Sequence, residues 1–392
     1  MLPSPRVYIL GCPRSGTTFV AELLNAHPDL HVSFWEAQFP LLLIRRTREP
    51  GPLESEPETT LELDQALVWH GIDVPARHGE RTLDRVAVGR ILRAWREGGT
   101  PAERRDRAAA RYWEERGPGA GDKVPDFTFI ADDLRDLHPG AFRIWVRRNL
   151  QETAASMLAV ARRNHHVFCA PDPRCAALVW LRREEQRLRY VPRPDRDLAV
   201  DYDEFCARPA ERSRDLLRAL GLKPTPQTEA FVASRFRTPV RRGPVDPGLD
   251  AFTARVRKEG LPADVPADLM AVDAQYAADP ITLLDHAVER DAGCFRALTG
   301  LAEAHWRGGD ADSAARWAEA ACIRGAADPV LRRPAGKAAL LRAWAARVVG
   351  DVAGAREWTK RSLELFPEYG LARRYLDEIL NACPPREGAF IG

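Results

Sequence analysis

Residues 6–18 read RVYILGCPRSGTT, and this stretch decides the fold of the first part of the chain. Residues 6–10 predict a short buried strand, because an apolar run, VYIL, follows Arg6. Two glycines follow at the spacing Gly11-x-x-x-x-Gly16, and apolar residues then recur at helical spacing until Pro28 excludes a longer helix. A strand, a glycine-bounded loop and a helix in succession form the first half of a βαβ unit.

The loop between this strand and helix has the spacing of a phosphate-binding P-loop. In such a loop the backbone N–H groups and the positive end of the helix converge on phosphate oxygens. The position of the lysine that nucleotide hydrolases use holds Thr17, and a positive charge stands inside the loop at Arg14. We therefore expect an anion site, but not an ordinary ATPase or GTPase.

Further strands are predicted at residues 141–146 and 198–202, and each is followed by a helical pattern. The stretch from 61 to 116 shows helical periodicity, and the glycines from 117 to 121 indicate a break. Strands that alternate with helices predict an α/β fold with a P-loop-type parallel sheet flanked by helices.

The composition changes near residue 259, after which strand signals vanish and alanine dominates. Two later segments resemble each other, LAEAHWRGGD at 301–310 and AWAARVVGD at 343–351, and each ends in a turn of Gly and Asp. Small residues and such turns are typical of tetratricopeptide-type helical hairpins, although an ordinary helical bundle is the alternative. We predict three parts, listed as an α/β domain at 1–258, a linker at 259–275 and an all-α tetratricopeptide-like C-terminal domain at 276–392.

The composition narrows the function classes. The 392 residues hold 58 Lys and Arg against 56 Asp and Glu, a net charge of +2 that disfavours a dedicated nucleic-acid or membrane-surface protein. The seven cysteines have irregular spacing and no C-x-x-C pair, so free thiols are expected in place of disulfides or a zinc site. No signal-peptide pattern or spanning apolar run is visible, and we expect a cytoplasmic protein.

At this point the residues resemble a known family. The sequence PRSGTT, followed by a helix and then Asn-Ala-His-Pro at 25–28, resembles the 5′-phosphosulfate loop of sulfotransferases that use 3′-phosphoadenosine 5′-phosphosulfate (PAPS). The tyrosylprotein sulfotransferase branch and its bacterial relatives are the most similar. The resemblance implies that Arg14 lies over the transferring sulfuryl group. It also implies that the cofactor is held by Pro13, Arg14, Ser15, Gly16, Thr17 and Thr18.

A second segment, RRNLQETAAS at 147–156, resembles the part of this family that binds the 3′-phosphate. Arg148 and Ser156 fill its two positions. A planar guanidinium and a hydroxyl suit a dianionic phosphate at the end of a strand, and such a site would favour PAPS over ATP. By the same resemblance Tyr202 and Arg241 are expected to contact the nucleotide, although Tyr202 could equally pack at its strand end.

The resemblance also suggests the catalytic residues, with no metal required. Glu36, in Ser-Phe-Trp-Glu, is expected to be the general base for the acceptor hydroxyl, after a one-residue insertion in the alignment. Lys123, in Gly-Asp-Lys-Val-Pro, is expected to stabilise the transferring sulfonate and the leaving oxygen together with Arg14. Other family members use a histidine near this segment, but Asp126 follows Pro125 here.

The sequence thus predicts a sulfotransferase that leaves 3′,5′-adenosine bisphosphate (PAP) as product. The acceptor stays open among a peptide tyrosine, a sugar and a small natural product. The alternatives are a P-loop kinase or nucleotide hydrolase with a helical-repeat scaffold, and a scaffold whose α/β half is inactive. The C-terminal helices leave open pairing with a second copy, docking of a protein partner and restriction of the acceptor channel.

Overall fold

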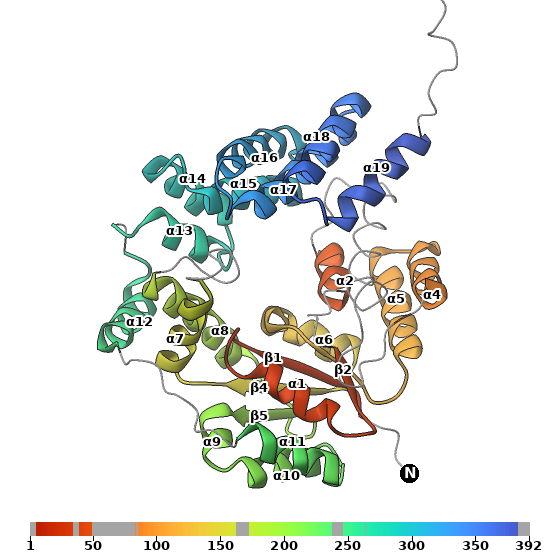
Figure 1. Ribbon diagram of the computed structural model, residues 1–392, viewed down its shortest axis with the longest axis vertical. Coiled ribbons are helices and arrows are strands. Elements are labelled where there is room, and N and C mark those ends of the chain that lie inside the picture. Colours follow the sequence, from red (N-terminus) through yellow and green to blue (C-terminus); the bar gives the residue numbers. More distant parts are fainter. Residues whose placement is uncertain are drawn as a thin grey trace, which may run out of the picture. The chain divides into compact units, whose positions relative to one another are not determined.

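The computed structural model describes residues 5–33, 39–48, 83, 85–161, 172–236, 246–262 and 264–382. Among these residues, those up to Pro262 form one compact unit and those from Asp264 onward form a second. The first unit holds a parallel sheet flanked by helices, and the second is helical (Figure 1). The predicted fold class is therefore confirmed.

The sheet of the first unit has five parallel strands in the order β2-β3-β1-β4-β5. The strands are β1 (Val7–Gly11), β2 (His31–Ser33), β3 (Ala120–Lys123), β4 (Phe142–Arg147) and β5 (Asp197–Asp201). The sequence predicted three of these and missed β2 and β3.

The glycines that suggested a break before residue 122 belong in part to β3. A Cβ atom at Gly121 would collide with the side chains of Val7 in β1 and Val32 in β2. The residue is a glycine because both neighbouring strands come close to it, and not because the chain turns there.

Helices cover both faces of the sheet (Figure 1). The described helices of this unit are α1 (Thr17–Asn25), α2 (Phe39–Arg48), α4 (Arg85–Arg96), α5 (Pro101–Arg116), α6 (Ala131–Leu137), α7 (Leu150–Ala161), α8 (Pro173–Arg189), α9 (Tyr202–Ala207), α10 (Pro209–Ala219), α11 (Pro226–Arg235) and α12 (Pro247–Glu259), with the 3₁₀ turn η1 at Pro125–Ile130. One face of the sheet packs an apolar core against α1, α10 and α11, in which Ile9, Phe19 and Leu217 are buried. Figure 1 shows α6 and α8 on the opposite face.

That opposite face carries a row of buried polar side chains, one from each strand. In strand order the row consists of Ser33, Asp122, Tyr8, Arg143 and Asp197, which are partners in the sheet register. The first four residues have no exposed surface, and the Asp197 side chain is 2% exposed. Buried polar groups must be satisfied by partners in the protein, so this row requires matching groups on the covering helices.

The partners of this row come from α5 and from the end of α8. The Tyr112 hydroxyl on α5 lies 2.9 Å from both carboxylate oxygens of Asp122. The Arg143 Nε atom donates to Asp197 Oδ1 at 2.7 Å and to the Tyr190 hydroxyl oxygen at 2.9 Å. These bonds fix the helices on this face to particular strands, and so they fix the edge of the sheet that is described below.

The second unit consists of helices α13 (Ala267–Ala274), α14 (Pro280–Arg290), α15 (Phe295–Arg307), α16 (Ala311–Ala326), α17 (Arg332–Val348), α18 (Val352–Leu365) and α19 (Gly370–Ala382). The two similar sequence segments form the last turns of α15 and α17 and the turns that lead into α16 and α18. Gly309 and Gly350 adopt φ angles of 87° and 84°, and Asp310 and Asp351 cap the helices that follow. The assignment to the tetratricopeptide type stays a prediction. The range 259–275, predicted as a linker, contains α13.

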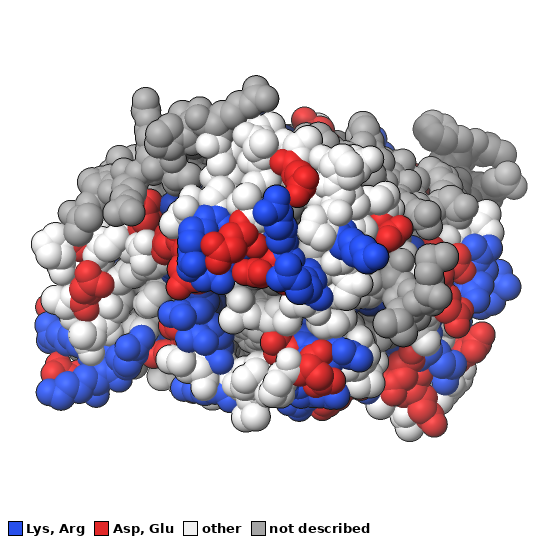
Figure 2. Space-filling view, turned by 90° about the horizontal axis from the view of Figure 1, so that it is seen from below, with Lys and Arg blue, Asp and Glu red and all other residues white. Residues whose placement is uncertain are grey.

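The surface of the described chain carries mixed charge. On the face that Figure 2 presents, Lys and Arg residues are interspersed with Asp and Glu residues, which agrees with the balanced composition. Among the described helices, none is both long and apolar enough to cross a bilayer.

Candidate functional site

The carboxyl ends of the five parallel strands meet at one edge of the sheet, where open α/β folds bind their ligands. At this edge β1 leads into the glycine loop, β3 ends at Lys123, and β4 leads into Arg148. The sequence analysis predicted that the glycine loop, Lys123 and Arg148 belong to one site. The strand order places β1 between β3 and β4, so the loop lies between the other two positions.

The loop from Gly11 to Gly16 has a backbone conformation that requires glycine at its two ends. Gly11 and Gly16 adopt φ angles of 147° and 102°, and Arg14, at 68°, is the one non-glycine residue with positive φ among the described residues. A Cβ atom at Gly11 would collide with the carbonyl oxygen of Val146, and one at Gly16 with the ring of Tyr202. The loop is therefore closely packed against β4 and α9.

The first helix begins directly after this loop. Gly16 is the N-cap of α1 and has no side chain, so the first N–H groups of the helix have no side-chain acceptor there. Thr17 is buried and Thr18 is exposed at the start of the helix. A turn of backbone N–H groups together with the positive end of a helix can bind an anion such as a phosphate or sulfate group.

Arg148 lies beside the loop and is held on several sides. Its Nη1 atom donates to the carbonyl oxygen of Arg14 at 3.4 Å, and its Nη2 atom pairs with Glu152 Oε2 at 3.0 Å. Its guanidinium carbon lies 5.3 Å from the centre of the Tyr202 ring, a cation–π contact. The Nε atom of Arg148 is buried without a hydrogen-bond acceptor among the described residues and lies 3.8 Å from Asp203 Oδ1.

The predicted residues of the two phosphate sites meet in this structure. Arg14 Nε donates to the hydroxyl of Ser156 on α7 at 3.1 Å, so the loop contacts the second segment through both Arg148 and Ser156. The sequence analysis predicted Tyr202 as the last residue of a strand, but Tyr202 is the first residue of α9. Burial raises the pKa of Tyr202 from 10.0 to about 12, and the hydroxyl is protonated at neutral pH, as that of an ordinary tyrosine also is.

Lys123 ends β3 on the face of the sheet that α1 covers. It is level with Ile9 of β1 in the register, and paired residues of parallel strands project to the same face. The residue is only 4% exposed. A buried cation at the carboxyl edge, on the side where the loop enters α1, can stabilise negative charge on a group bound to the loop.

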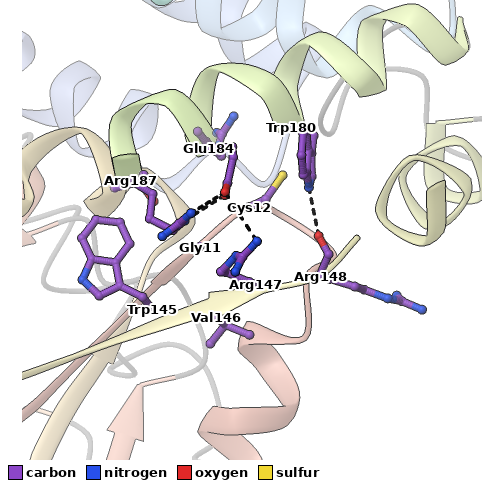
Figure 3. Close-up of a pocket in the computed structure, with 11 residues that line it drawn as sticks. Gly11, Cys12, Trp145, Val146, Arg147, Arg148, Trp180, Glu184 and Arg187 are labelled. Carbon is purple, nitrogen blue, oxygen red and sulfur yellow. Dashed lines mark hydrogen bonds and ion pairs between the residues drawn. The ribbon is translucent and has the colours of Figure 1, made fainter. Parts of the chain in front are cut away.

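Behind the loop, between the sheet and α8, lies a cavity of about 20 Å³ (Figure 3). Such a volume has room for about one water molecule, so the cavity is no substrate site. Glu184 on α8 pairs with Arg147 at 3.7 Å and with Arg187. Figure 3 shows Arg147 pointing toward Glu184, while the side chain of Arg148 extends the other way. The two adjacent arginines at the end of β4 therefore belong to different environments.

The structure adds residues that the sequence analysis did not single out. Trp180 on α8 donates through Nε1 to the carbonyl oxygen of Arg148 at 3.0 Å. Asp203 on α9 accepts from the backbone and side-chain nitrogens of Asn149 at 2.9 and 2.8 Å. Arg183 on α8 pairs with Asp126, the residue after Pro125, at 2.7 Å.

Two predicted site residues, Glu36 and Arg241, lie outside the described residues. In the described chain, no group of three or more His, Cys, Asp or Glu side chains is placed to hold a metal ion.

Comparison with known proteins gives one family. The sequence profile of the Sulfotransferase family matches residues 5–226, more than half of the 392-residue chain. A curated relative is nodulation protein NoeE of Sinorhizobium fredii, 29% identical over 160 residues that cover 40% of this chain and 32% of that protein. The chain thus matches about a third of the length of that relative.

Solved structures were also compared. The sulfotransferase domain from the curacin biosynthetic pathway is 15% identical and aligns with 67% of this chain and 99% of its own, with a TM-score of 0.38. Sulfotransferase STF9 from Mycobacterium avium is 18% identical and aligns with 70% of this chain and 76% of its own, with a TM-score of 0.37.

Proposed function

The chain belongs to the sulfotransferase family, and we propose that it transfers the sulfuryl group of PAPS to a hydroxyl acceptor and releases PAP. One observation carries the choice of donor. The glycine loop and Arg148, each suited to an anion, touch each other at one sheet edge through the 3.4 Å contact between Arg148 Nη1 and the Arg14 carbonyl oxygen. A nucleotide with a 5′-phosphosulfate and a 3′-phosphate presents two anionic groups a short distance apart.

The residues present fit such a donor. Gly11 and Gly16 let the loop backbone pack closely against Val146 and Tyr202, and the N-terminus of α1 would face a group bound at the loop. At the position proposed for the 3′-phosphate, the buried Nε–H of Arg148 has no hydrogen-bond acceptor among the described residues. A buried donor without an acceptor costs free energy, and a bound anion would remove this cost. Ser156 adds a hydroxyl and Tyr202 an aromatic face beside the guanidinium.

In the proposed reaction the acceptor oxygen forms a bond to sulfur while the bond from sulfur to the phosphate oxygen of the donor breaks. Lys123 and Arg14 neutralise the charge that builds on the sulfonate and on the leaving oxygen. Glu36 takes the proton of the acceptor hydroxyl. We expect this reaction to need no metal, because side-chain cations and backbone N–H groups would meet the charges that develop.

The competing hypothesis is a P-loop kinase or nucleotide hydrolase. Thr17 occupies the position of the lysine on which those enzymes depend, and this disfavours the hypothesis. For the acceptor, we keep three classes of hydroxyl group open: a peptide tyrosine, a sugar and a small natural product. Fold alone does not decide among them.

A thermal-shift titration tests the donor. PAP at 100 times its Kd should stabilise the folded chain by about 2.7 kcal/mol, because a ligand bound only by the folded state raises the melting temperature. ATP with magnesium should raise the melting temperature much less. Stabilisation by ATP and magnesium with no response to PAP would overturn the proposal in favour of the kinase or hydrolase.

A second experiment tests the transfer itself. Incubation with PAPS and a panel of phenolic peptides, sugars and small alcohols should give at least one sulfated product, detected by mass spectrometry. Glu36→Gln should bind PAP as the wild type does but should turn over more slowly. Full turnover by Glu36→Gln would rule out Glu36 as the base.

A further inference from the structure

The junction between β4 and α7 is held by a carboxylate from a different element. Asp203, in the first turn of α9, accepts through Oδ2 from the backbone N–H of Asn149 at 2.9 Å and from its side-chain Nδ2 at 2.8 Å. Its other oxygen, Oδ1, lies 3.8 Å from Arg148 Nε. One side chain thus fixes two consecutive residues at the point where the strand turns into the helix.

Asn149 in turn fixes the start of α7. Its Oδ1 accepts from the backbone N–H of Glu152 at 2.9 Å, and its carbonyl oxygen accepts from the N–H of Thr153 at 3.2 Å. These are the bonds of a helix N-cap. Helix α7 carries both Glu152, which pairs with Arg148, and Ser156. A displacement of Asn149 would therefore move all the residues proposed for the 3′-phosphate.

The same junction is held from the other side by α8. Trp180 donates through its indole nitrogen to the carbonyl oxygen of Arg148 at 3.0 Å (Figure 3). Arg148 therefore has a fixed backbone as well as a guanidinium that is held by Glu152, the Arg14 carbonyl oxygen and Tyr202.

Two features separate Asp203 from a residue that only stabilises its own helix. The cap of α9 is Asp201, whose Oδ1 accepts from the N–H groups of Asp203 and Glu204 at 3.0 and 3.1 Å, so the Asp203 side chain is not needed for that role. The Asp203 side chain is also 39% exposed and adds little to the core. Its charge repels an anion bound at Arg148, so any contribution to anion binding must come from geometry.

From these contacts we propose that Asp203 is a positioning residue for the donor nucleotide. It holds Asn149 and the Arg148 backbone so that the guanidinium and Ser156 face a phosphate group together. This inference rests on the proposed function, because PAP and PAPS are the ligands that reveal it. Asp203 itself is not expected to touch the reacting atoms.

The test uses the full-length chain and four variants, with PAP binding measured by calorimetry and turnover measured with PAPS. Asp203→Ala should raise the Kd for PAP and the KM for PAPS about tenfold, which corresponds to the loss of roughly one charge-assisted hydrogen bond. The kcat at saturating PAPS should stay within about twofold, because the reacting atoms are not contacted. Asp203→Asn keeps an oxygen that can accept from the N–H of Asn149, and should bind PAP within about threefold of the wild type.

Two further variants keep the test decisive. Glu204→Ala is the matched control, since Glu204 is the neighbouring carboxylate and pairs with Arg212 at 2.8 Å, away from the junction; its Kd for PAP should not change. Asp203→Glu keeps the charge but moves it by one methylene group, and should weaken PAP binding several-fold because the bonds to Asn149 no longer fit. This variant tests the proposal even if Asp203→Ala fails to fold.

The outcomes separate the two proposals. If the wild type does not bind PAP, the proposed function fails. If the wild type binds PAP and both Asp203→Ala and Asp203→Glu bind it equally well, the positioning role is wrong. A loss in Asp203→Asn as large as that in Asp203→Ala would also overturn it, because the carboxylate would then act through its charge and not by holding Asn149.

Discussion

Removal of the Arg148 guanidinium is the most direct test of the anion site. In Arg148→Ala, the side chain that contacts Glu152 at 3.0 Å, the Arg14 carbonyl oxygen at 3.4 Å and the Tyr202 ring is lost. The carboxylates of Glu152 and Asp203 remain, now without the cation between them. The position proposed for the 3′-phosphate would then change from a cationic to an acidic surrounding.

The magnitude follows from the lost contacts. A hydrogen bond from an arginine to a phosphate oxygen contributes about 1.5–3 kcal/mol, and a guanidinium can make two of them in parallel. The carboxylates of Glu152 and Asp203 would add a repulsion, which is screened by solvent because the Asp203 side chain is 39% exposed. Two hydrogen bonds at the lower figure already amount to about 3 kcal/mol, so the Kd for PAP should rise by at least about 100-fold.

Calorimetric titration with PAP measures this change, and the chain offers a matched control next to the target. Arg147 is also an arginine at the end of β4, but it is 47% exposed and pairs with Glu184 on the α8 side. Arg147→Ala should change the Kd for PAP by less than about threefold. Arg148→Lys keeps the charge but loses the planar fork, and an intermediate loss of about tenfold is expected.

Two results would refute this reasoning. Arg148→Ala with a Kd within about threefold of the wild type would mean that the nucleotide does not use this guanidinium. An equal loss in Arg147→Ala and Arg148→Ala would mean that the general positive charge of the strand end matters, and not the particular position of Arg148.

Three further predictions concern catalysis and stability. Lys123→Ala should lower kcat by at least about 100-fold, as removal of a charge-stabilising group does, and leave the Kd for PAP nearly unchanged; an unchanged kcat would remove Lys123 from the mechanism. Asp197→Ala leaves the buried Arg143 without its 2.7 Å partner and should lower the free energy of unfolding in urea by about 3–5 kcal/mol, whereas Asp195→Ala, at an exposed residue, should have little effect. Burial and the nearby Arg6 lower the pKa of His138 from 6.5 to about 3, so the folded state favours the neutral ring. The contribution of the neutral His138 ring to the free energy of unfolding is then fully present above pH 6.5 and is lost toward pH 3, by up to about 1.4 kcal/mol per pH unit. His138→Gln should therefore flatten the dependence of the melting temperature on pH over that range. Parallel pH profiles for the wild type and His138→Gln would contradict the lowered pKa of His138.

The sequence predicted those strands and helices whose signal lies within a few consecutive residues. β1, β4 and β5 contain apolar runs, and the glycine loop marks the place where a strand turns into a helix. β2 and β3 were missed because they are three and four residues long and carry members of the buried polar row, Ser33 and Asp122. Their burial depends on partners such as Tyr112, which lies on a separate helix. A rule that equates buried strands with apolar residues fails for such a row.

The candidate site was predictable to the same extent. Arg14, Arg148 and Ser156 stand in motifs with a fixed spacing, and the structure brings them into contact. The pair formed by Arg148 and Glu152 carries no such signal, because Arg148 precedes the N-cap of α7 and the rule for residues four apart within a helix does not apply to it. Trp180 and Asp203 carry no such signal, because their roles depend on how α8 and α9 pack against the end of β4.

The contacts at the loop imply that its two proposed anion sites do not act independently. Arg148 Nη1 donates to the backbone of Arg14, and the Arg14 side chain donates to Ser156, so each site supplies a bond that orders the other. Groups that share a network show coupling energies of about 0.5–3 kcal/mol in double-mutant cycles, whereas distant groups add. A donor that fills both sites therefore gains from an arrangement that either phosphate group helps to order. A nucleotide with only one of the two anionic groups must order the Arg14–Arg148 contact with half of the interactions. The contact between Arg14 and Arg148 therefore favours a ligand that carries both anionic groups.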